Sequence, residues 1–600
     1  MSCDQHSNYA KWLSDFRERN GRNLRVLHIG NIANNAYNNA KIQRKAGIEA
    51  DVICYDYYHI MGCPEWEDHE FSGAIDAFYP DWWATDLKGP RRPFWFAQGP
   101  LLKCIAYLNA LRGNGRFRSW YWRQSLELSY WRLLDQRAKS ERKRRSANVS
   151  MPGRYYVAVL LWIAFCLSGM WVPNALKLAA YRIVLRRDWY VGYRSKAVAE
   201  SEQRLRRSNL DWRAKISWRL KFWRSRLHFL PYLVKTLSRA GKALLGQAIR
   251  MKGVGVGDAI RTAKQMAELY DSYHPNALSQ SRAADLEYLC DLSLPWLQLL
   301  KHYDVIQGYS TDGLIPMRWG RQYCAYEHGT LREIPFEDSI QGRVCNLTYR
   351  KADVVFITNS DVLPMADALG IRPDQRVYLP HAFDDRKIAT FAANHGDLQP
   401  PKDGRVHFFC PARQHWKVGG AAWCKGNDRY IRAAAILAAR GVPIQLTMVA
   451  WGAELDLSRQ LIDELGCADI ITWVDPMRKR ELLQSYLRAH AVIDQFVIPA
   501  LGGVAFEAMG VGRRLITYID ADCLEKFFGK APPLMAAETV EQIIARMQQV
   551  ADDLEDRAGL GAAALKWIRD YHSSERILSL QVGAYSRMLS SEGAVRDAAE

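Results

Sequence analysis

The sequence predicts an α/β protein of two domains with parallel sheets, the first of which carries a large basic helical insertion. Two separate parts of the chain alternate short apolar segments with segments of helical period. A strongly cationic, tryptophan-rich stretch interrupts the first of them. A length of 600 residues exceeds what one hydrophobic core normally supports, which agrees with two domains and an insertion.

The first domain begins with a strand, a helix and a second strand. We expect the strand at residues 24–29, a helix that ends near Gly47, and the next strand at residues 51–55. The pattern resumes far downstream in YDVIQGYS, QYCAYEHGT and KADVVFITNSD, each a short apolar strand followed by a polar turn. These later strands must rejoin the sheet that residues 24–29 begin.

The second domain repeats the pattern between residues 405 and 520. Its expected strands are HFFCPA, IQLTMVA, DIITWV, AVIDQFVI and LITYI, and helical segments separate them. The tail, residues 565–589, is helical by period. We therefore expect a first domain in two parts (1–111 and 257–383), an insertion (112–256), a second domain (384–570), and a C-terminal helix and tail that cross back to the first domain (571–600).

The stretch VIPALGGVAFEAMGVGRRLITY, residues 497–518, predicts a phosphate site. It reads as the end of a buried strand, a turn at Gly502-Gly503 and a helix over residues 504–512. Backbone N–H groups at a glycine-rich helix start bind pyrophosphate, because no Cβ obstructs the approach and the helix dipole favours an anion. Glu507, one turn into the helix, is placed to accept both hydroxyls of a ribose. Taken alone, the pattern also fits an ordinary turn with packing glycines and a surface glutamate.

The C-terminal half resembles the GT-B glycosyltransferases of the retaining group-1 type (family 4). The family pattern is E-x-F-G-x-x-x-x-E followed by A-M-x-x-G-x-P-V-I, and this chain matches it at Gly502, Glu507, Ala508, Met509, Gly512 and Leu515-Ile516. The segments FFCPARQHW and KGNDRYIRAAAILAARG resemble the upstream element. The chain departs from the pattern in two places: Pro499 occupies the first acidic position, and the interval from Arg413 to Lys425 is longer than usual.

The resemblance implies a nucleotide-sugar donor and names its binding residues. Arg413 and Lys425 match the arginine and lysine that hold the donor diphosphate, beside Gly502, Gly503 and Glu507. These cations and amides meet the charge of the leaving group without a metal ion, so we expect no metal and no cofactor beyond the donor. Asp494 is an alternative source for the missing carboxylate.

The resemblance also implies an acceptor side in the first domain. The loop Tyr326-Glu327-His328-Gly329-Thr330 follows an expected strand, and in related enzymes a His or acidic residue there contacts the transferring sugar or the acceptor. His328 is the candidate catalytic residue, and Glu327 is the alternative acid or base. A loop histidine bonded to backbone is an equally good explanation of His328 alone. His28 is expected to be structural, and His381 a linker residue.

The insertion holds most of the positive charge. Of 82 Lys and Arg and 64 Asp and Glu, the stretch from Arg112 to Lys252 has 32 and 7, so it carries +25 and the rest of the chain −7. It also holds nine of the 21 tryptophans. The 22 residues 155–176 (YYVAVLLWIAFCLSGMWVPNAL) are uncharged and long enough to span a bilayer. A single crossing would separate strands that share one sheet, so we expect a monotopic segment on an anionic membrane surface.

Two other interpretations of the insertion remain open: a buried core helix, and a site for single-stranded nucleic acid. The uncharged run argues against nucleic acid, which offers nothing to bury it, and we expect no nucleic-acid partner.

The leading functional hypothesis is a membrane-associated glycosyltransferase, retaining and metal-independent. It would act at the cytoplasmic face of the cell membrane on a lipid-linked or envelope saccharide, as in bacterial surface polysaccharide synthesis. The alternatives are a non-catalytic nucleotide-sugar-binding scaffold and a GT-B nucleotide-sugar epimerase. Scattered single cysteines and a polar N-terminus favour a reducing cytoplasm and no cleaved export signal.

Overall fold

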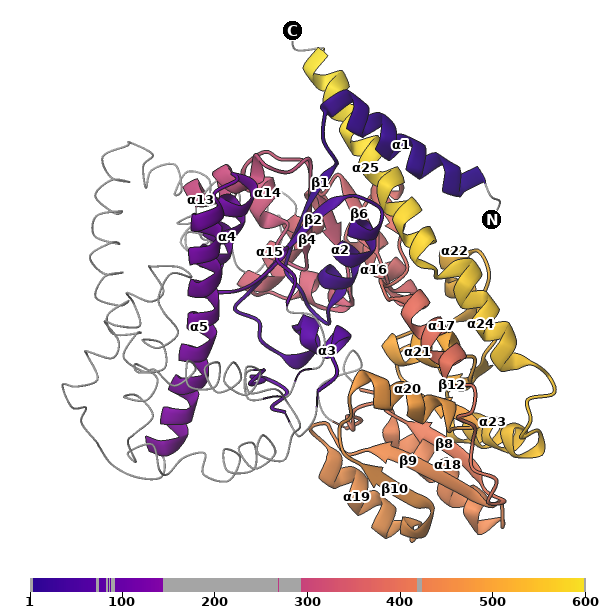
Figure 1. The fold of residues 1–600 in the computed structure, drawn as a ribbon. Helices are drawn as coiled ribbons and strands as arrows, with labels where there is room; N and C mark the ends of the chain where they lie inside the picture. The colour runs from indigo at the N-terminus through magenta and orange to yellow at the C-terminus, as the bar shows by residue number, and fades with distance from the viewer. Residues whose placement is uncertain are drawn as a thin grey trace.

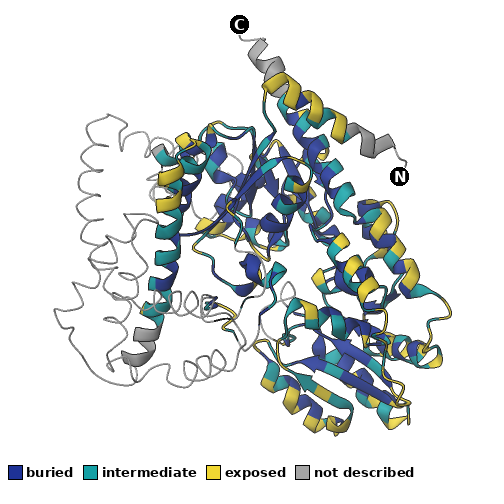
Figure 2. Cartoon of the chain, in the orientation of Figure 1, coloured by how far each residue is buried: buried dark blue, intermediate teal, exposed yellow. Residues whose placement is uncertain are grey.

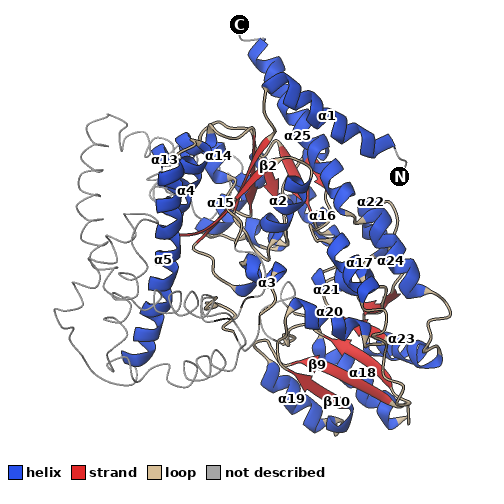
Figure 3. Ribbon diagram, in the orientation of Figure 1, coloured by secondary structure: helices blue, strands red, loops and turns tan. Residues whose placement is uncertain are grey.

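The computed structural model describes residues 4–71, 75–82, 85, 87, 92–143, 268, 293–417 and 424–597. These residues form two parallel sheets with helices packed on both faces, which confirms the predicted α/β class with two doubly wound domains (Figures 1 and 3). Of the predicted insertion, residues 112–256, the structure describes residues 112–143. The uncharged run 155–176 lies outside the described residues.

The first sheet joins strands from both sides of the insertion, as the sequence requires. Val26 pairs in parallel register with Val305, so segments about 280 residues apart become neighbours. The strand order is β3-β2-β1-β4-β5-β6-β7. The strands are β1 (Arg25–Ile29), β2 (Glu49–Tyr55), β3 (Phe96–Gly99), β4 (Val305–Tyr309), β5 (Cys324–Tyr326), β6 (Val354–Ile357) and β7 (Arg376–Tyr378).

Alternate residues of these strands enter two different cores, because helices cover both faces of a parallel sheet. Leu27 and Ile29 pack in one core, whereas Val26 and Val52 pack in the other. Figure 2 shows the strands of both sheets largely buried beneath the helices. The first core includes side chains of α4 (Leu101–Arg112), α13 (Ser293–Leu300) and α15 (Ile340–Lys351), and the second includes side chains of α1 (Asp4–Asn20), α2 (Asn35–Lys45) and α25 (Ser574–Asp597). The remaining helices of this domain are α3 (Pro64–Asp68), α5 (Arg116–Lys143), α14 (Leu314–Arg318) and α16 (Leu363–Ala368).

The second sheet has the order β10-β9-β8-β11-β12-β13, with every described pair parallel. Its strands are β8 (Val406–Cys410), β9 (Ile444–Val449), β10 (Ile471–Val474), β11 (Ala491–Ile493), β12 (Arg514–Thr517) and β13 (Met535–Ala536). Its helices are α18 (Asn427–Ala439), α19 (Leu455–Glu464), α20 (Lys479–Leu487), α21 (Gly503–Gly510), α22 (Ala521–Phe528), α23 (Val540–Asp552) and α24 (Leu560–Tyr571), and α17 (Asp385–Asn394) precedes them.

Strand β11 is shorter than the apolar pattern predicts. The expected strand continues to Val497, but the structure ends it at Ile493, and residues 494–501 form a loop. The backbone N–H of Phe496 turns away from the sheet and donates to the carbonyl of Lys425 at 2.9 Å. Phe496 is nevertheless fully buried, which explains why its apolar character resembles that of a strand residue.

The C-terminal helix α25 leaves the second domain and packs on the first sheet, beside α1 (Figure 1). A buried polar network connects it there. Gln43 donates to both Gln581 (3.0 Å) and Tyr585 (2.9 Å), and His28 lies 2.9 Å from Gln43 and 3.1 Å from the Tyr309 hydroxyl. Burial lowers the pKa of His28 to about 4. His28 is therefore a neutral structural group, as predicted.

The two domains contact each other through α3 and the residues after it. Lys387 of α17 donates to the carbonyl of Glu67, Arg478 donates to the carbonyl of Phe71, and Arg480 pairs with Glu70 at 2.6 Å. These contacts lie beside the edges of the sheets from which the site loops emerge.

The predicted insertion starts at Arg112, the last residue of α4, and its described part continues as α5, whose Leu126 packs in the same core as α4. The first two turns of α5 expose Phe117, Trp120 and Tyr121, which the spacing of three and four residues places on one face. Among the helices that the structure describes, none combines the length and the apolar character needed to cross a bilayer.

Candidate functional site

The strand order reverses once in each sheet, and the loops at these two points form the candidate site. β1 lies between β2 and β4, and β8 lies between β9 and β11. In doubly wound sheets, ligands bind at the carboxyl ends of the strands on either side of such a reversal. In the second domain these are the loops after β8 and β11, which carry Arg413 and residues 494–501.

Lys425 joins the two loops of the second domain. Its backbone N–H donates to the carbonyl of His415 at 2.6 Å, and its carbonyl accepts from Phe496. Its ammonium group donates to the Gln495 side chain, whose amide nitrogen donates to the carbonyls of Ile498 (3.3 Å) and Ala500 (2.8 Å). Lys425 is thus held in place by both segments that border the strand-order reversal.

The predicted diphosphate cations lie together and repel each other. Burial lowers the pKa of Lys425, and the guanidinium groups of Arg413 and Arg332 lower it further, against the opposing effect of Asp494. Burial also lowers the pKa of Arg413. A lysine whose pKa is lowered by neighbouring cations in a buried site is stabilised by a bound anion.

Gly502 and Gly503 form the start of α21 beside these cations. Gly502 has an extended backbone (φ −101°) and is the N-terminal cap, and Gly503 begins the helix. A Cβ added to Gly503 would meet no described atom within 4 Å, so the first turn of the helix is open to a ligand. Gly502 lies beside Asp494, whose charge acts on Lys425 as that of Arg413 does, so donor binding by Arg413, Lys425, Gly502 and Gly503 stays a prediction.

Asp494 lies beneath this glycine turn. Its Oδ2 is 3.8 Å from the position of a Cβ on Gly502, and only 3% of the residue is exposed. Burial raises the pKa of Asp494 to about 6, although Lys425 opposes the shift. A carboxyl group with this pKa accepts or donates a hydrogen bond near neutral pH. Asp494 is thus a carboxyl group of the site at the position where the sequence suggests one.

Glu507 has two protein partners. Its carboxylate forms an ion pair with Lys479 of α20 and accepts a hydrogen bond from the Tyr486 hydroxyl at 3.0 Å. The residue is 8% exposed. A ribose would have to share or displace these partners, so ribose binding by Glu507 stays a prediction. Trp473 of β10 lies with its ring centroid 5.7 Å from the Arg459 guanidinium of α19.

Glu327 supports the first-domain loop from below. Its side chain is completely buried and accepts from the backbone N–H groups of Gly329 and Thr358 (3.2 Å) and from the amide of Asn359 (3.1 Å). Burial raises the pKa of Glu327, and Arg332 opposes the shift. This geometry favours a positioning role for Glu327, which connects the loops after β5 and β6.

His328 is better placed for chemistry than Glu327. It is partly exposed, its Nδ1 lies 3.5 Å from the Thr330 hydroxyl, and its Nε2 has no hydrogen-bond partner among the described residues. Burial lowers the pKa of His328 to about 4, and Arg332 acts in the same direction. The imidazole is therefore neutral at pH 7, and its Nε2 is shielded from solvent without a hydrogen-bond partner among the described residues.

His381, expected to be a linker residue, lies between the domains near this group. Its ring nitrogens are 3.4 Å from Asn35 Oδ1 and 3.3 Å from Asn359 Oδ1, and its ring centroid is 5.9 Å from that of Phe506 in α21. Burial and the nearby His328 lower the pKa of His381 to about 3. The His328 loop of the first domain and the α21 turn of the second therefore border one site.

Two side chains of the first-domain wall have no counterpart in the sequence-based prediction. Asp312, after β4, accepts a hydrogen bond from Tyr55 and packs against Gly30 at the end of β1, at the strand-order reversal. Burial raises the pKa of Asp312 to about 7. Arg332 follows the His328 loop. The sequence could have indicated Asp312, because Thr311-Asp312-Gly313 directly follows an expected strand. No sequence pattern marks Arg332.

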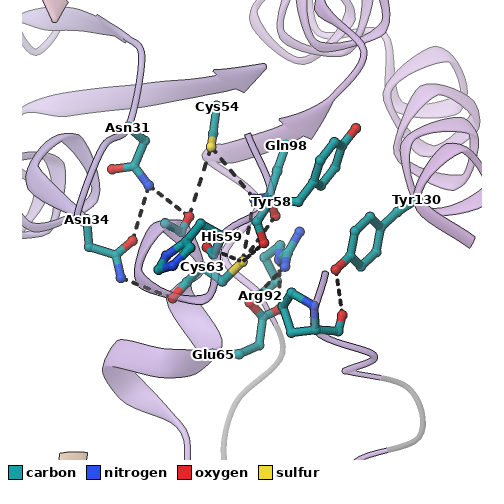
Figure 4. Close-up of polar contacts among 12 residues, drawn as sticks. Asn31, Asn34, Cys54, Tyr58, His59, Cys63, Glu65, Arg92, Gln98 and Tyr130 are labelled. Atoms are coloured by element: carbon teal, nitrogen blue, oxygen red, sulfur yellow. Dashed lines mark hydrogen bonds and ion pairs between the residues drawn. The ribbon is translucent and has the colours of Figure 1, made fainter. Parts of the chain in front are cut away.

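The loop after β1 is fixed by a second polar cluster (Figure 4). Asn31 donates to the carbonyl of Gly62 at 3.0 Å, and Asn34 donates to the carbonyl of Cys63 at 3.1 Å. The adjacent Glu65 receives two hydrogen bonds from Arg92, at 2.8 and 2.7 Å. This cluster holds α3, and with it the contacts to the second domain.

No family model and no curated protein matches the chain. Among solved structures, the chain is similar to a sucrose-phosphate synthase from Thermosynechococcus elongatus, with 17% identity over 52% of this chain and 78% of that one and a TM-score of 0.38. It is similar to HepE from Anabaena in complex with UDP and glucose (17% identity, 51% and 84% covered, TM-score 0.39). A glycosyltransferase from Rickettsia africae is 13% identical, with 55% and 81% covered and a TM-score of 0.37.

Proposed function

We propose that this chain is a glycosyltransferase that moves a sugar from a nucleotide-sugar donor to a saccharide or lipid-linked acceptor. The observation that carries the proposal is the meeting of Arg413, Lys425 and the open start of α21 at the strand-order reversal of the second sheet. This arrangement suits a diphosphate, because two cations and free helix N–H groups converge there. The first domain adds His328 on the opposite wall.

The charge of the leaving group explains how these residues would act. The acceptor oxygen bonds to the anomeric carbon, the bond from that carbon to the diphosphate breaks, and the diphosphate leaves with the electron pair. The acceptor's hydroxyl proton leaves with a phosphate oxygen. Fixed cations and amide dipoles stabilise the charge that develops, so we propose a metal-independent reaction. We also propose retention of the anomeric configuration, on the resemblance to family 4.

The donor site is tested by binding. Lys425→Gln and Arg413→Gln should each weaken UDP binding by about 1.5–3 kcal/mol, because each removes one charge-assisted contact to the same group. Arg405→Gln is a matched control, since Arg405 precedes β8 at the opposite edge of the sheet and donates to Gln445 at 2.7 Å. Wild-type affinity in both site variants would overturn the assignment.

Turnover is tested by mass spectrometry of products from a panel of nucleotide sugars and native membrane lipids. A new glycolipid or extended saccharide is the expected result. Binding of the donor with no product would favour the scaffold alternative, and a changed donor without acceptor would favour epimerisation.

We further propose that the protein acts at the cytoplasmic side of the cell membrane, on which residues 112–256 form a monotopic anchor. The +25 charge and the uncharged run 155–176 support this, as do Phe117, Trp120 and Tyr121 exposed on α5. The protein should resist extraction by high salt and be released by detergent, and deletion of residues 155–176 should make it salt-extractable. Labels at cysteines introduced near Asn8 and Ser590 in a cysteine-free background should react from the same side; reaction from opposite sides would refute a monotopic anchor.

A further inference from the structure

Arg332 is held by one half of its guanidinium group. Its Nε and Nη2 donate to Asp361 at 2.6 and 2.9 Å, a two-pronged ion pair in which the Asp361 side chain is 9% exposed. The Nη1 edge lies over Gly329, in the space that a Cβ would occupy. Gly329 also has a left-handed backbone (φ 99°). A glycine is therefore needed there both for the turn and for the passage of the guanidinium.

The Nη1 edge has no hydrogen-bond partner among the residues described, although Asp361 uses the other side of the group. The Arg332 side chain is 17% exposed, so this edge is not sealed in the core. An arginine whose fork is already oriented by a carboxylate loses little freedom when its remaining N–H groups bind a second anion.

Arg332 acts across the site on the second domain. It contributes, after burial and Arg413, to the low pKa of Lys425, and it contributes in the same direction to those of His328 and His381. These residues belong to different loops and different domains. Their common dependence on Arg332 places its positive charge within reach of the space between His328 and Lys425.

Carboxylates also surround these cations, and Asp361, Glu327 and Glu333 together raise the pKa of Arg332 against the effect of burial. Asp361 is committed to Arg332, and Glu507 is committed to Lys479. Burial raises the pKa of both Asp494 and Glu327, so the surroundings disfavour their charged forms. Arg332 of the first domain and Arg413 of the second both lower the pKa of Lys425, and an anion with several oxygens would relieve this repulsion.

We propose that Arg332 is a third ligand of the donor diphosphate, supplied by the first domain. This rests on the proposed function, and it adds that the leaving group is bound from both walls of the site. Because Arg332 belongs to the other domain, its contact links diphosphate binding to the approach of the two domains. Arg413 and Lys425 bind the diphosphate first, and Arg332 stabilises it further as the bond to the sugar breaks.

The test uses the full-length protein and removes the Arg332 charge without leaving Asp361 unpaired. The variant is Arg332→Gln/Asp361→Asn, and its control is Arg22→Gln/Asp304→Asn. Arg22 makes the same two-pronged pair with Asp304, at 2.7 and 2.7 Å, remote from the site at the start of β1. Thermal unfolding confirms that both double variants fold.

The probes are UDP and inorganic pyrophosphate in calorimetric titrations, with kcat and KM for a turned-over donor. We expect the Arg332 double variant to bind both probes about tenfold more weakly than the control. Its kcat should fall by a larger factor than its KM rises. Equal affinity for both probes in the two double variants, with unchanged kcat, would overturn the proposal. Lys425→Gln serves as the reference variant. If Lys425→Gln also keeps wild-type affinity for UDP, the donor site itself is assigned wrongly. If Lys425→Gln loses UDP affinity but the Arg332 double variant does not, only the role of Arg332 is rejected.

Discussion

Replacing Glu507 by Gln tests whether this carboxylate is a structural partner or a ribose ligand. The Glu507 and Lys479 side chains are 11% and 19% exposed and form an ion pair between α20 and α21. Removing one member of a buried pair leaves the other charge uncompensated, at a cost of about 3–5 kcal/mol. Burial lowers the pKa of Lys479, but Glu507 and, to a smaller extent, Glu67 and Asp68 outweigh it and raise the pKa. Glu67 and Asp68 remain in the variant and still stabilise the Lys479 charge. We therefore expect the free energy of unfolding to fall by about 3 kcal/mol, the lower end of that range.

The assay is urea unfolding followed by circular dichroism, with a double-mutant cycle. Lys479→Met should also destabilise the protein, because it leaves Glu507 buried and unpaired. The Glu507→Gln/Lys479→Met protein should regain most of the lost stability, since neither charge then remains. A Glu507→Gln protein as stable as wild type, or a double variant that shows the sum of both losses, would refute the buried-pair argument.

The same four proteins separate the two roles. If Glu507 binds ribose, the double variant should bind UDP more weakly than Lys479→Met does, although its fold is restored. Equal UDP affinity in these two variants would show that Glu507 serves only the packing of α20 against α21.

Two further predictions concern the first-domain wall. His328→Ala should lower kcat by roughly tenfold or more and leave the affinity for UDP nearly unchanged, because the imidazole is neutral and lacks the charge that binds a diphosphate. Steady-state kinetics beside UDP titration checks this, and the reverse pattern would remove His328 from the chemistry. Burial raises the pKa of Asp312 to about 7, so the folded state binds its proton more tightly than the unfolded state, and wild type should lose stability as the pH rises from about 4 to about 7. Asp312→Asn has no carboxyl proton to lose at this position, so its free energy of unfolding relative to wild type should be higher at pH 8 than at pH 5. The same difference in free energy of unfolding at both pH values would contradict the shifted pKa.

Local pattern was sufficient for the fold and for the glycine-rich helix start in the second domain. Two alternating runs of short strands and helices predict two parallel sheets, because strand length, turn residues and helical period are properties of neighbouring residues. The same holds for the start of α21, where Gly502 and Gly503 precede a helix. Arg413 and Lys425 follow from the resemblance, and the structure brings them together at the reversal beside β8 and β11.

Local pattern failed where burial and strand structure differ. Phe496 and Val497 are apolar and continue a strand-like run, yet β11 ends at Ile493. The loop is buried because Lys425 and Gln495 supply its hydrogen bonds, and both contacts come from tertiary packing. Periodicity alone does not distinguish a buried loop of this kind from a longer strand.

The sequence by itself determined two doubly wound domains, a cationic stretch within the first, and a glycine-rich helix start in the second. Only the tertiary structure decided which side chains meet: Glu507 with Lys479, Asp312 with Tyr55, and Arg332 with Asp361. The physical reason is that helical and strand periods depend on neighbours in the chain, whereas ion pairs and shifted pKa values depend on residues that packing brings together from distant segments. The role of a carboxylate or guanidinium in this protein is therefore a property of its partners.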